Sequence, residues 1–178
     1  MRGCRNLKKL LSFEKKNYFL KRTDYIKCKI LREHEYYIWD FQKELRREEY
    51  FIKNKKNIRR FFSHIKKNYL GVKLGFFIPA NVFGEGLHIW HYGNIIVNGN
   101  AQIGKNCVLH GNNCIGNNGK EGNECPVIGD NVDIGTGATI IGGVYIANNI
   151  KIGAGAVVIN SFEEEGITIA GIPAKKVR

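Results

Sequence analysis

Hydrophobic residues recur at two different spacings along the chain, one in each part of it. From about Asp24 to Tyr69 they follow helical spacing, which predicts two helices divided near residues 54 to 57. From residue 77 onward an aliphatic residue or Phe returns every six positions. Six is not a multiple of the 3.6-residue helical turn, so the second part requires a different kind of structure.

Six-residue blocks such as IGDNVD, IGTGAT and IIGGVY predict a parallel β-helix. Each block would supply one short strand and one turn, and three blocks would close one coil. The aliphatic first residues would stack into a continuous core, while Gly and Asn would occupy turn positions with positive φ. A break in the repeat at residues 117 to 127 predicts a loop that leaves the coil, where binding residues commonly lie.

Composition and charge change at the same place as the spacing. Twenty of the 21 glycines lie at or after Gly71, and residues 1 to 73 carry 22 Lys or Arg against 8 Asp or Glu. We therefore expect a basic helical N-terminal region over 1–73 and a β-helix domain with a C-terminal tail over 74–178. A charge of +14 attracts polyanions, so the basic helices are either a solvated surface or a peripheral contact with an anionic membrane. No nucleic-acid partner is expected.

Cysteine usage and hydropathy favour a reduced, soluble protein. The five cysteines show neither paired metal-site spacing nor a disulfide framework, which fits a cytoplasmic location. No apolar stretch approaches the roughly 18 residues of a membrane span. We expect a cytoplasmic protein, with the inner face of the membrane as its alternative location.

Residues 87 to 96, LHIWHYGNII, place unusual side chains in an otherwise small and aliphatic repeat. Aligning the coils puts the block of Ile89 next to the block of Leu109, so that His91 and His110 would project on one side with His88 at the corner. Three histidines raise the alternative of a zinc site. A neutral imidazole acting as a general base needs no metal, and we expect no metal here.

Residues 74 to 178 resemble the hexapeptide-repeat acyltransferases, most closely the serine acetyltransferase-like branch associated with surface-polysaccharide synthesis. The stretches LGFFIPANVFGEGLHIWHYGNIIVNGNAQIG, NVDIGTGATIIGGVYIANNIKIGAGAVV and ITIAGIPAKKV carry this resemblance. It implies a mainly β fold, a left-handed parallel β-helix preceded by the small helical region. It also implies a homotrimer with acetyl-CoA bound between adjacent β-helices.

The resemblance also implies roles for individual residues. His91 matches the catalytic base, and the two extra residues near Ile95 match the family's irregularity beside that histidine. Contacts to acetyl-CoA carry over to four positions, which are Gly116, Asn117, Thr136 and Ala154. Four lysines are offered to the CoA phosphates on charge and expected location, with a solvated surface as the alternative for each: Lys120, Lys151, Lys175 and Lys176.

The resemblance places three further groups of the serine enzymes at positions where this chain lacks them. Phe76 stands in place of the acid that pairs with the base, Trp90 in place of an Asp before the catalytic histidine, and Cys125 in place of a second active-site histidine. Aromatic and amide side chains suit a sugar ring instead, and the candidate acceptor-binding residues are Trp90, Tyr92, Asn81, Asn94 and His110. The sequence therefore predicts O-acetyl transfer to a surface polysaccharide or its sugar precursor. The alternatives are serine O-acetylation for cysteine biosynthesis and a non-catalytic trimeric scaffold that binds a membrane or polyanion.

Overall fold

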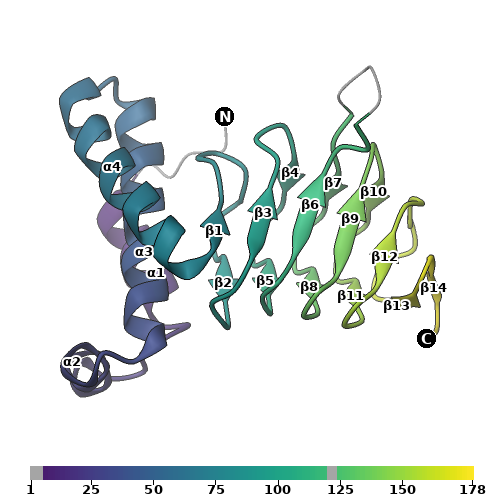
Figure 1. The fold of residues 1–178 in the computed structure, drawn as a ribbon, viewed down its shortest axis with the longest axis horizontal. Helices are drawn as coiled ribbons and strands as arrows, with labels where there is room; N and C mark the ends of the chain where they lie inside the picture. The colour runs from purple at the N-terminus through teal and green to yellow at the C-terminus, as the bar shows by residue number, and fades with distance from the viewer. Residues whose placement is uncertain (1–5, 120–123) are drawn as a thin grey trace.

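The computed structural model describes residues 6–119 and 124–178. Four helices lie at one end of a long array of short strands, and the array carries the C-terminus at its other end (Figure 1). The helices are α1 (Leu7–Lys15), α2 (Arg22–Leu31), α3 (His34–Lys53) and α4 (Asn57–Leu74). In the described part of the chain, no helix is both long and apolar enough to cross a membrane.

The helical region differs from the two-helix prediction. A helix break falls at Asn54–Lys56 as the spacing predicts, but a second break at Arg32 and Glu33 separates α2 from α3. Arg32 takes a left-handed conformation with φ of 57°, which ends α2. The first helix, α1, was not predicted; it buries Leu10 and Glu14, and Glu14 joins a polar network with Gln42 and Arg46 of α3.

The strands form three parallel sheets that the chain visits in rotation. Sheet 1 contains β1 (Phe76–Phe77), β3 (Ile95–Val97), β6 (Cys114–Gly116), β9 (Thr139–Ile141) and β12 (Val157–Val158). Sheet 2 contains β4 (Gln102–Ile103), β7 (Val127–Ile128) and β10 (Tyr145–Ile146). Sheet 3 contains β2 (His88–Ile89), β5 (Val108–Leu109), β8 (Asp133–Ile134), β11 (Lys151–Ile152), β13 (Thr168–Gly171) and an antiparallel final strand, β14 (Ala174–Lys176). This rotation is the arrangement of a parallel β-helix.

Register follows the six-residue repeat. The aliphatic residues that begin the blocks pair from coil to coil in sheet 3 and are almost fully buried, namely Ile89, Leu109, Ile134, Ile152 and Ile169. Apolar side chains thus stack along the axis of the coil and form one continuous core.

Asparagines shape one corner of the coil. Asn106, Asn131 and Asn149 have φ of 53°, 57° and 60°, a conformation that asparagine tolerates better than most residues. Their amides are linked in a ladder, with Asn106 Nδ2 donating to Asn131 Oδ1 at 2.9 Å and Asn131 Nδ2 to Asn149 Oδ1 at 3.0 Å. The predicted use of asparagine at positive-φ turns is confirmed.

A buried ionic network attaches the helices to the first coil. Arg46 of α3 bonds Glu14 of α1, with 2.8 Å between Nη2 and Oε1, and donates to the carbonyl oxygen of Phe83 at 3.1 Å. Glu14 in turn accepts from the amide of Gly86 at 2.8 Å. Because both charged side chains are buried and paired, the network fixes where the helices lie relative to the β-helix.

Candidate functional site

The turn between β2 and β3 is longer than the turns below it. Eight positions separate Ile89 from Val97, whereas six separate their partners Leu109 and Ile115 in the next coil. The predicted slip of two residues is therefore present, and it makes the turn at residues 90 to 94 protrude with an exposed His91 near its tip.

Backbone hydrogen bonds hold both ends of this turn. The Trp90 amide donates to Leu109 O at 2.8 Å, and the Gly93 amide donates to Leu74 O, at the end of α4, at 3.0 Å. The Asn94 amide donates to Asn112 Oδ1 at 3.0 Å. The imidazole of His91 therefore projects from a fixed backbone, as a positioned base requires.

Trp90 lies at the centre of a cluster of imidazoles. Its ring centroid is 4.9 Å from His88, 5.8 Å from His110 and 6.3 Å from His91. His110 stacks on Trp90 with an interplanar angle of 12°, and its Nε2 lies 2.8 Å from Asp133 Oδ1. In the register of the coils, His110 lies next to Trp90, and Gly111 lies next to His91.

Tyr18, in the turn that follows α1, completes the cluster, and no pattern in the sequence pointed to it. Its hydroxyl accepts from the Ile89 amide at 2.9 Å and donates to Gln42 at 2.7 Å, and its ring meets His88 edge-on at 5.1 Å. Burial lowers the pKa of His88, and the neighbouring His110 lowers it further. His88 is therefore neutral at physiological pH.

Small residues continue below His91 along the same edge of the coil. Gly111, Thr136 and Ala154 follow it in successive coils, joined by hydrogen bonds from Gly137 N to Gly111 O at 2.9 Å and from Gly155 N to Thr136 O at 2.8 Å. At Gly135, a Cβ atom would lie 2.6 Å from the amide nitrogen of Ala154. The edge below His91 is consequently flat and rich in backbone groups.

The other predicted cofactor residues lie on the opposite edge of sheet 1. Gly116 ends β6 and Asn117 follows it, where the chain leaves sheet 1 for sheet 2. A Cβ atom at Gly116 would meet no atom within 4 Å, so the surface beside it is open. The two groups of predicted contacts therefore lie on different sides of sheet 1.

The four candidate lysines have different surroundings. Lys151 is exposed on sheet 3 beside Asp133 of the preceding coil, and Lys175 is exposed on β14. Lys176 Nζ is bound to Glu164, 2.6 Å from Oε1, so it is partly neutralised. Lys120 lies outside the described residues.

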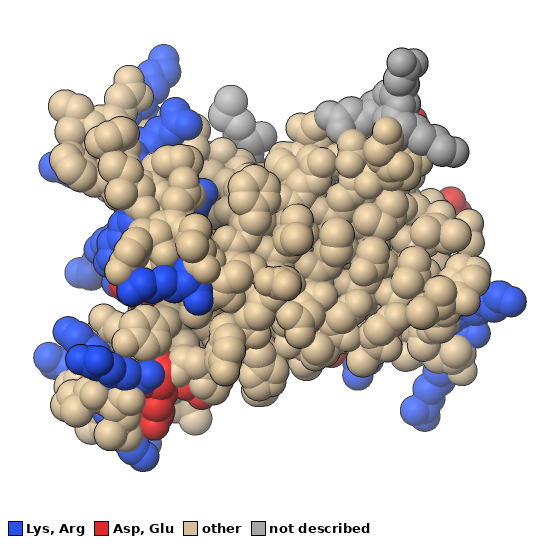
Figure 2. Space-filling view, in the orientation of Figure 1, with Lys and Arg blue, Asp and Glu red and all other residues tan. Residues whose placement is uncertain are grey.

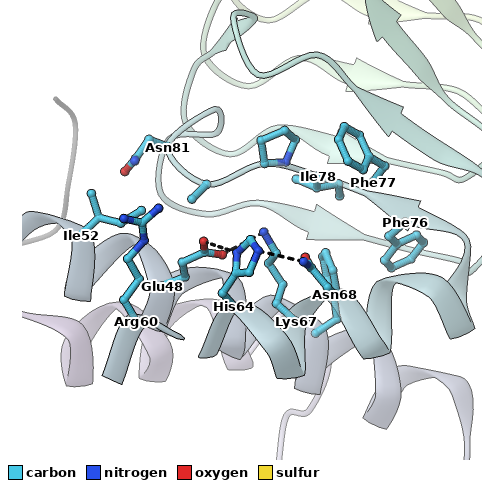
Figure 3. Close-up of a pocket in the computed structure, with 13 residues that line it drawn as sticks. Glu48, Ile52, Arg60, His64, Lys67, Asn68, Phe76, Phe77, Ile78 and Asn81 are labelled. Carbon is cyan, nitrogen blue, oxygen red and sulfur yellow. Dashed lines mark hydrogen bonds and ion pairs between the residues drawn. The ribbon is translucent and has the colours of Figure 1, made fainter. Parts of the chain in front are cut away.

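Asn81 is separated from the other predicted acceptor residues. It lines a cavity of about 470 Å³ between α3, α4 and the first coil, and its amide donates to Glu49 at 2.9 Å (Figure 3). His91, Trp90 and Tyr92 do not line this cavity. The place of Asn81 in the acceptor site therefore stays a prediction.

The polar wall of this cavity is an ionic cluster. Glu48 Oε1 lies 2.8 Å from His64 Nδ1, and Glu48 Oε2 lies 2.8 Å from Lys67 Nζ (Figure 3). Burial alone would raise the pKa of Glu48, but its hydrogen bonds from Lys67 and His64 outweigh this and hold the pKa below its usual value. The cluster joins α3 to α4 and provides no nucleophile.

Two of the positions at which this chain departs from the serine enzymes have apolar surroundings. Phe76 is buried and its ring packs edge-on against Phe41 at 5.2 Å. Cys125 is half-buried against the hydrophobic core, and burial raises the pKa of its thiol. Neither position supplies a group that could support His91.

One group of potential metal ligands forms among residues 6–119 and 124–178, and it does not contain the three histidines that raised the alternative of a zinc site. Cys28, Glu33 and Glu35 bring their ligand atoms within 4.8 Å of one another. Burial and the hydrogen bond to Glu33 raise the pKa of the Cys28 thiol to about 11, so the sulfur holds its proton instead of acting as a thiolate.

No sequence-family profile and no curated protein sequence matches the chain. Solved structures of serine acetyltransferases do match its fold over nearly its whole length. The soybean apoenzyme has a TM-score of 0.74 at 25% identity, and the match covers 96% of this chain and 69% of that chain. The Neisseria gonorrhoeae enzyme in complex with serine has a TM-score of 0.70 at 25% identity, with 97% and 69% covered.

The Brucella abortus enzyme gives a similar match, with a TM-score of 0.72 at 23% identity over 96% of this chain and 68% of that chain. A second structure of the same enzyme contains coenzyme A. Serine acetyltransferases are acyltransferases, and the chain shares their architecture of N-terminal helices followed by parallel sheets. The fold thus places the chain in the acyltransferase class.

Proposed function

We propose that this protein is an acetyl-CoA-dependent O-acetyltransferase in which His91 is the general base. The observation that carries the proposal is the protruding, anchored turn that presents His91 at the head of a flat edge of small residues. His91 would take the proton of the acceptor hydroxyl while the oxygen attacks the thioester carbonyl. The proton would then pass to the departing CoA sulfur, so that free CoA and an acetyl ester leave.

We propose that acetyl-CoA lies between two copies of the chain, with the coil left-handed and the oligomer a trimer as the resemblance implies. The two edges of sheet 1 support this arrangement, because one bears His91, Thr136 and Ala154 and the other bears Gly116 and Asn117. Threefold packing through sheet 1 would bring one edge of a copy against the other edge of its neighbour.

The outer surface of sheet 1 supports such packing. The outward-facing residues in register are Phe77, Ile96, Cys114, Thr139 and Val157, none of them charged. Figure 2 shows this face of the β-helix almost without charged side chains, while lysines and arginines gather over the helices and near the C-terminus. An exposed Phe77 and Ile96 are expected in a surface that another copy covers.

Serine is the acceptor that the comparisons favour, since the matched enzymes are serine acetyltransferases and one is solved in complex with serine. A sugar hydroxyl is the second candidate. It is favoured by the exposed Trp90 and Tyr92 beside His91, which offer flat apolar surfaces to a sugar ring. The phosphate-binding lysines, a cytoplasmic location and membrane contact through the basic helices are proposals of lower rank.

An acceptor screen tests the proposed function. Release of free CoA thiol is followed with acetyl-CoA and L-serine, N-acetyl-L-serine, nucleotide sugars or oligosaccharides, and the ester product is identified by mass. We expect turnover with L-serine that His91→Ala abolishes. Turnover with sugars alone would show that the acceptor is a sugar hydroxyl and not serine. If a folded trimer turned over none of these acceptors, the proposed enzymatic function would be contradicted. The non-catalytic scaffold would then be the remaining hypothesis.

A further inference from the structure

His34, from the N-terminal region, lies against the proposed base. It is the first residue of α3, and its ring centroid is 5.9 Å from that of His91 and 6.0 Å from that of Tyr92. Four of the five histidines of the chain therefore meet around one turn, and the fifth, His64, lies in the cavity between α3 and α4.

The His91 imidazole lacks other support. Within the described part of the chain, its ring makes no hydrogen bond or ion pair, and its neighbours are the rings of His34 and Trp90. The resemblance places a supporting acid at position 76, but Phe76 is buried against Phe41 and cannot serve. A base that must accept a proton in one orientation needs a neighbour that fixes its ring.

We propose that His34, together with Glu35, positions the imidazole of His91 and favours its protonated form during acetyl transfer; this rests on the proposed function. His34 Nε2 lies 3.5 Å from Glu35 Oε1, so a carboxylate lies next to the imidazole that neighbours His91. As His91 takes the proton of the acceptor, it becomes positive beside this pair. The first turn of α3 thereby takes over the role of the missing acid.

Glu35 is unusually placed for an ordinary surface carboxylate. Its second oxygen, Oε2, is buried and has no hydrogen-bond partner among the residues that the structure describes. Around the pair, the titratable groups are Cys28 of α2, Glu33 before α3, and His91 and Tyr92 of the β2–β3 turn. The Cys28 thiol donates to Glu33 at 2.9 Å, which leaves Glu35 as the carboxylate next to His34.

Steady-state kinetics of His34 variants test this role. We expect His34→Ala to lower kcat about tenfold with the KM for acetyl-CoA unchanged, because a displaced base slows the chemical step. His34→Asn, which keeps a planar hydrogen-bonding group, should recover part of the loss. Both variants are first compared with the wild type by thermal unfolding.

A pH profile separates positioning from simple packing. Glu35→Gln removes a negative charge near His91, so the acidic limb of kcat/KM should move to lower pH. Glu33→Gln is the matched control. It removes the same charge only two residues away, but from a carboxylate that accepts a hydrogen bond from Cys28. Its shift should be smaller.

The outcomes remain distinguishable from failure of the proposed function. A wild type without turnover on any acceptor contradicts the proposed function itself. An active wild type whose folded His34 variants keep its rate overturns the inference. The inference is also overturned if Glu33→Gln and Glu35→Gln shift the acidic limb of the kcat/KM profile equally. If His34→Ala does not fold, His34→Asn and Glu35→Gln decide by the same criteria.

Discussion

Replacing Arg46 by Met should destabilise the whole protein. The guanidinium is 2% exposed and bonds Glu14 at 2.8 Å, Glu49 at 2.9 Å and the carbonyl oxygen of Phe83 at 3.1 Å. Met fills a similar volume but leaves the fully buried Glu14 without its cation. Breaking one partner of a buried pair costs about 3–5 kcal/mol, because the remaining charge has lost its water and gained nothing.

The expected loss is large enough to read from a thermal melt. For a chain of this size each kcal/mol corresponds to about 2–4 °C, so Tm should fall by about 6–20 °C. Arg47→Met is the matched control on the same helix. Arg47 is partly exposed, and its partner Glu44 keeps Lys66 at 3.2 Å, so this variant should lose less than about 1 kcal/mol. Equal melting temperatures for the two variants would refute the reasoning.

Four further outcomes follow from the site and its surroundings. His91→Ala should lower the rate of acetyl transfer about a hundredfold or more with Tm near the wild type, since general base catalysis has this scale and the side chain is exposed; a wild-type rate would contradict the role of His91. Cys125→Ala should keep most of the activity, because burial raises the pKa of the thiol, and a stable acetyl adduct on Cys125 in intact-mass spectra would oppose this. The free energy of unfolding should fall below about pH 4, because Asp40 and Glu48 have pKa values below the ordinary carboxyl value and their contribution is lost as pH falls through them; denaturant melts at several pH values measure this, and acid-independent stability would contradict it. Light scattering should give the mass of a trimer, and an active monomer would contradict the shared groove.

The six-residue period carried most of the information about the second part of the chain. It predicted the three-strand coil, the pairing of Ile89 with Leu109, and the two extra residues in the turn of His91. These features depend on local spacing, which a single sequence records directly. The repeat did not predict that His110 stacks on Trp90, because the period fixes the register of the strands and not the ring contacts within a turn.

The contacts that the sequence did not reveal join segments distant along the chain. Tyr18 reaches Ile89 across 71 positions, and Glu14 reaches Gly86 across 72. His34 likewise meets His91 only because of the way α3 docks on the first coil. Such contacts depend on buried ion pairs and helix docking, which have no period in the sequence. The surroundings of Asn81 have the same origin, since its neighbours come from α3 and α4.

The most direct test of the account combines two inactive variants. His91→Ala removes the base from one edge of sheet 1, and Gly116→Trp places a bulky side chain in the open space at the other edge. Each is expected to be inactive alone. If the groove lies between copies, co-expressed chains form some sites from two intact edges, and random mixing should restore about a quarter of the wild-type rate of CoA release. Mixed trimers that remain as inactive as either variant, beside an active wild type, would contradict the shared site.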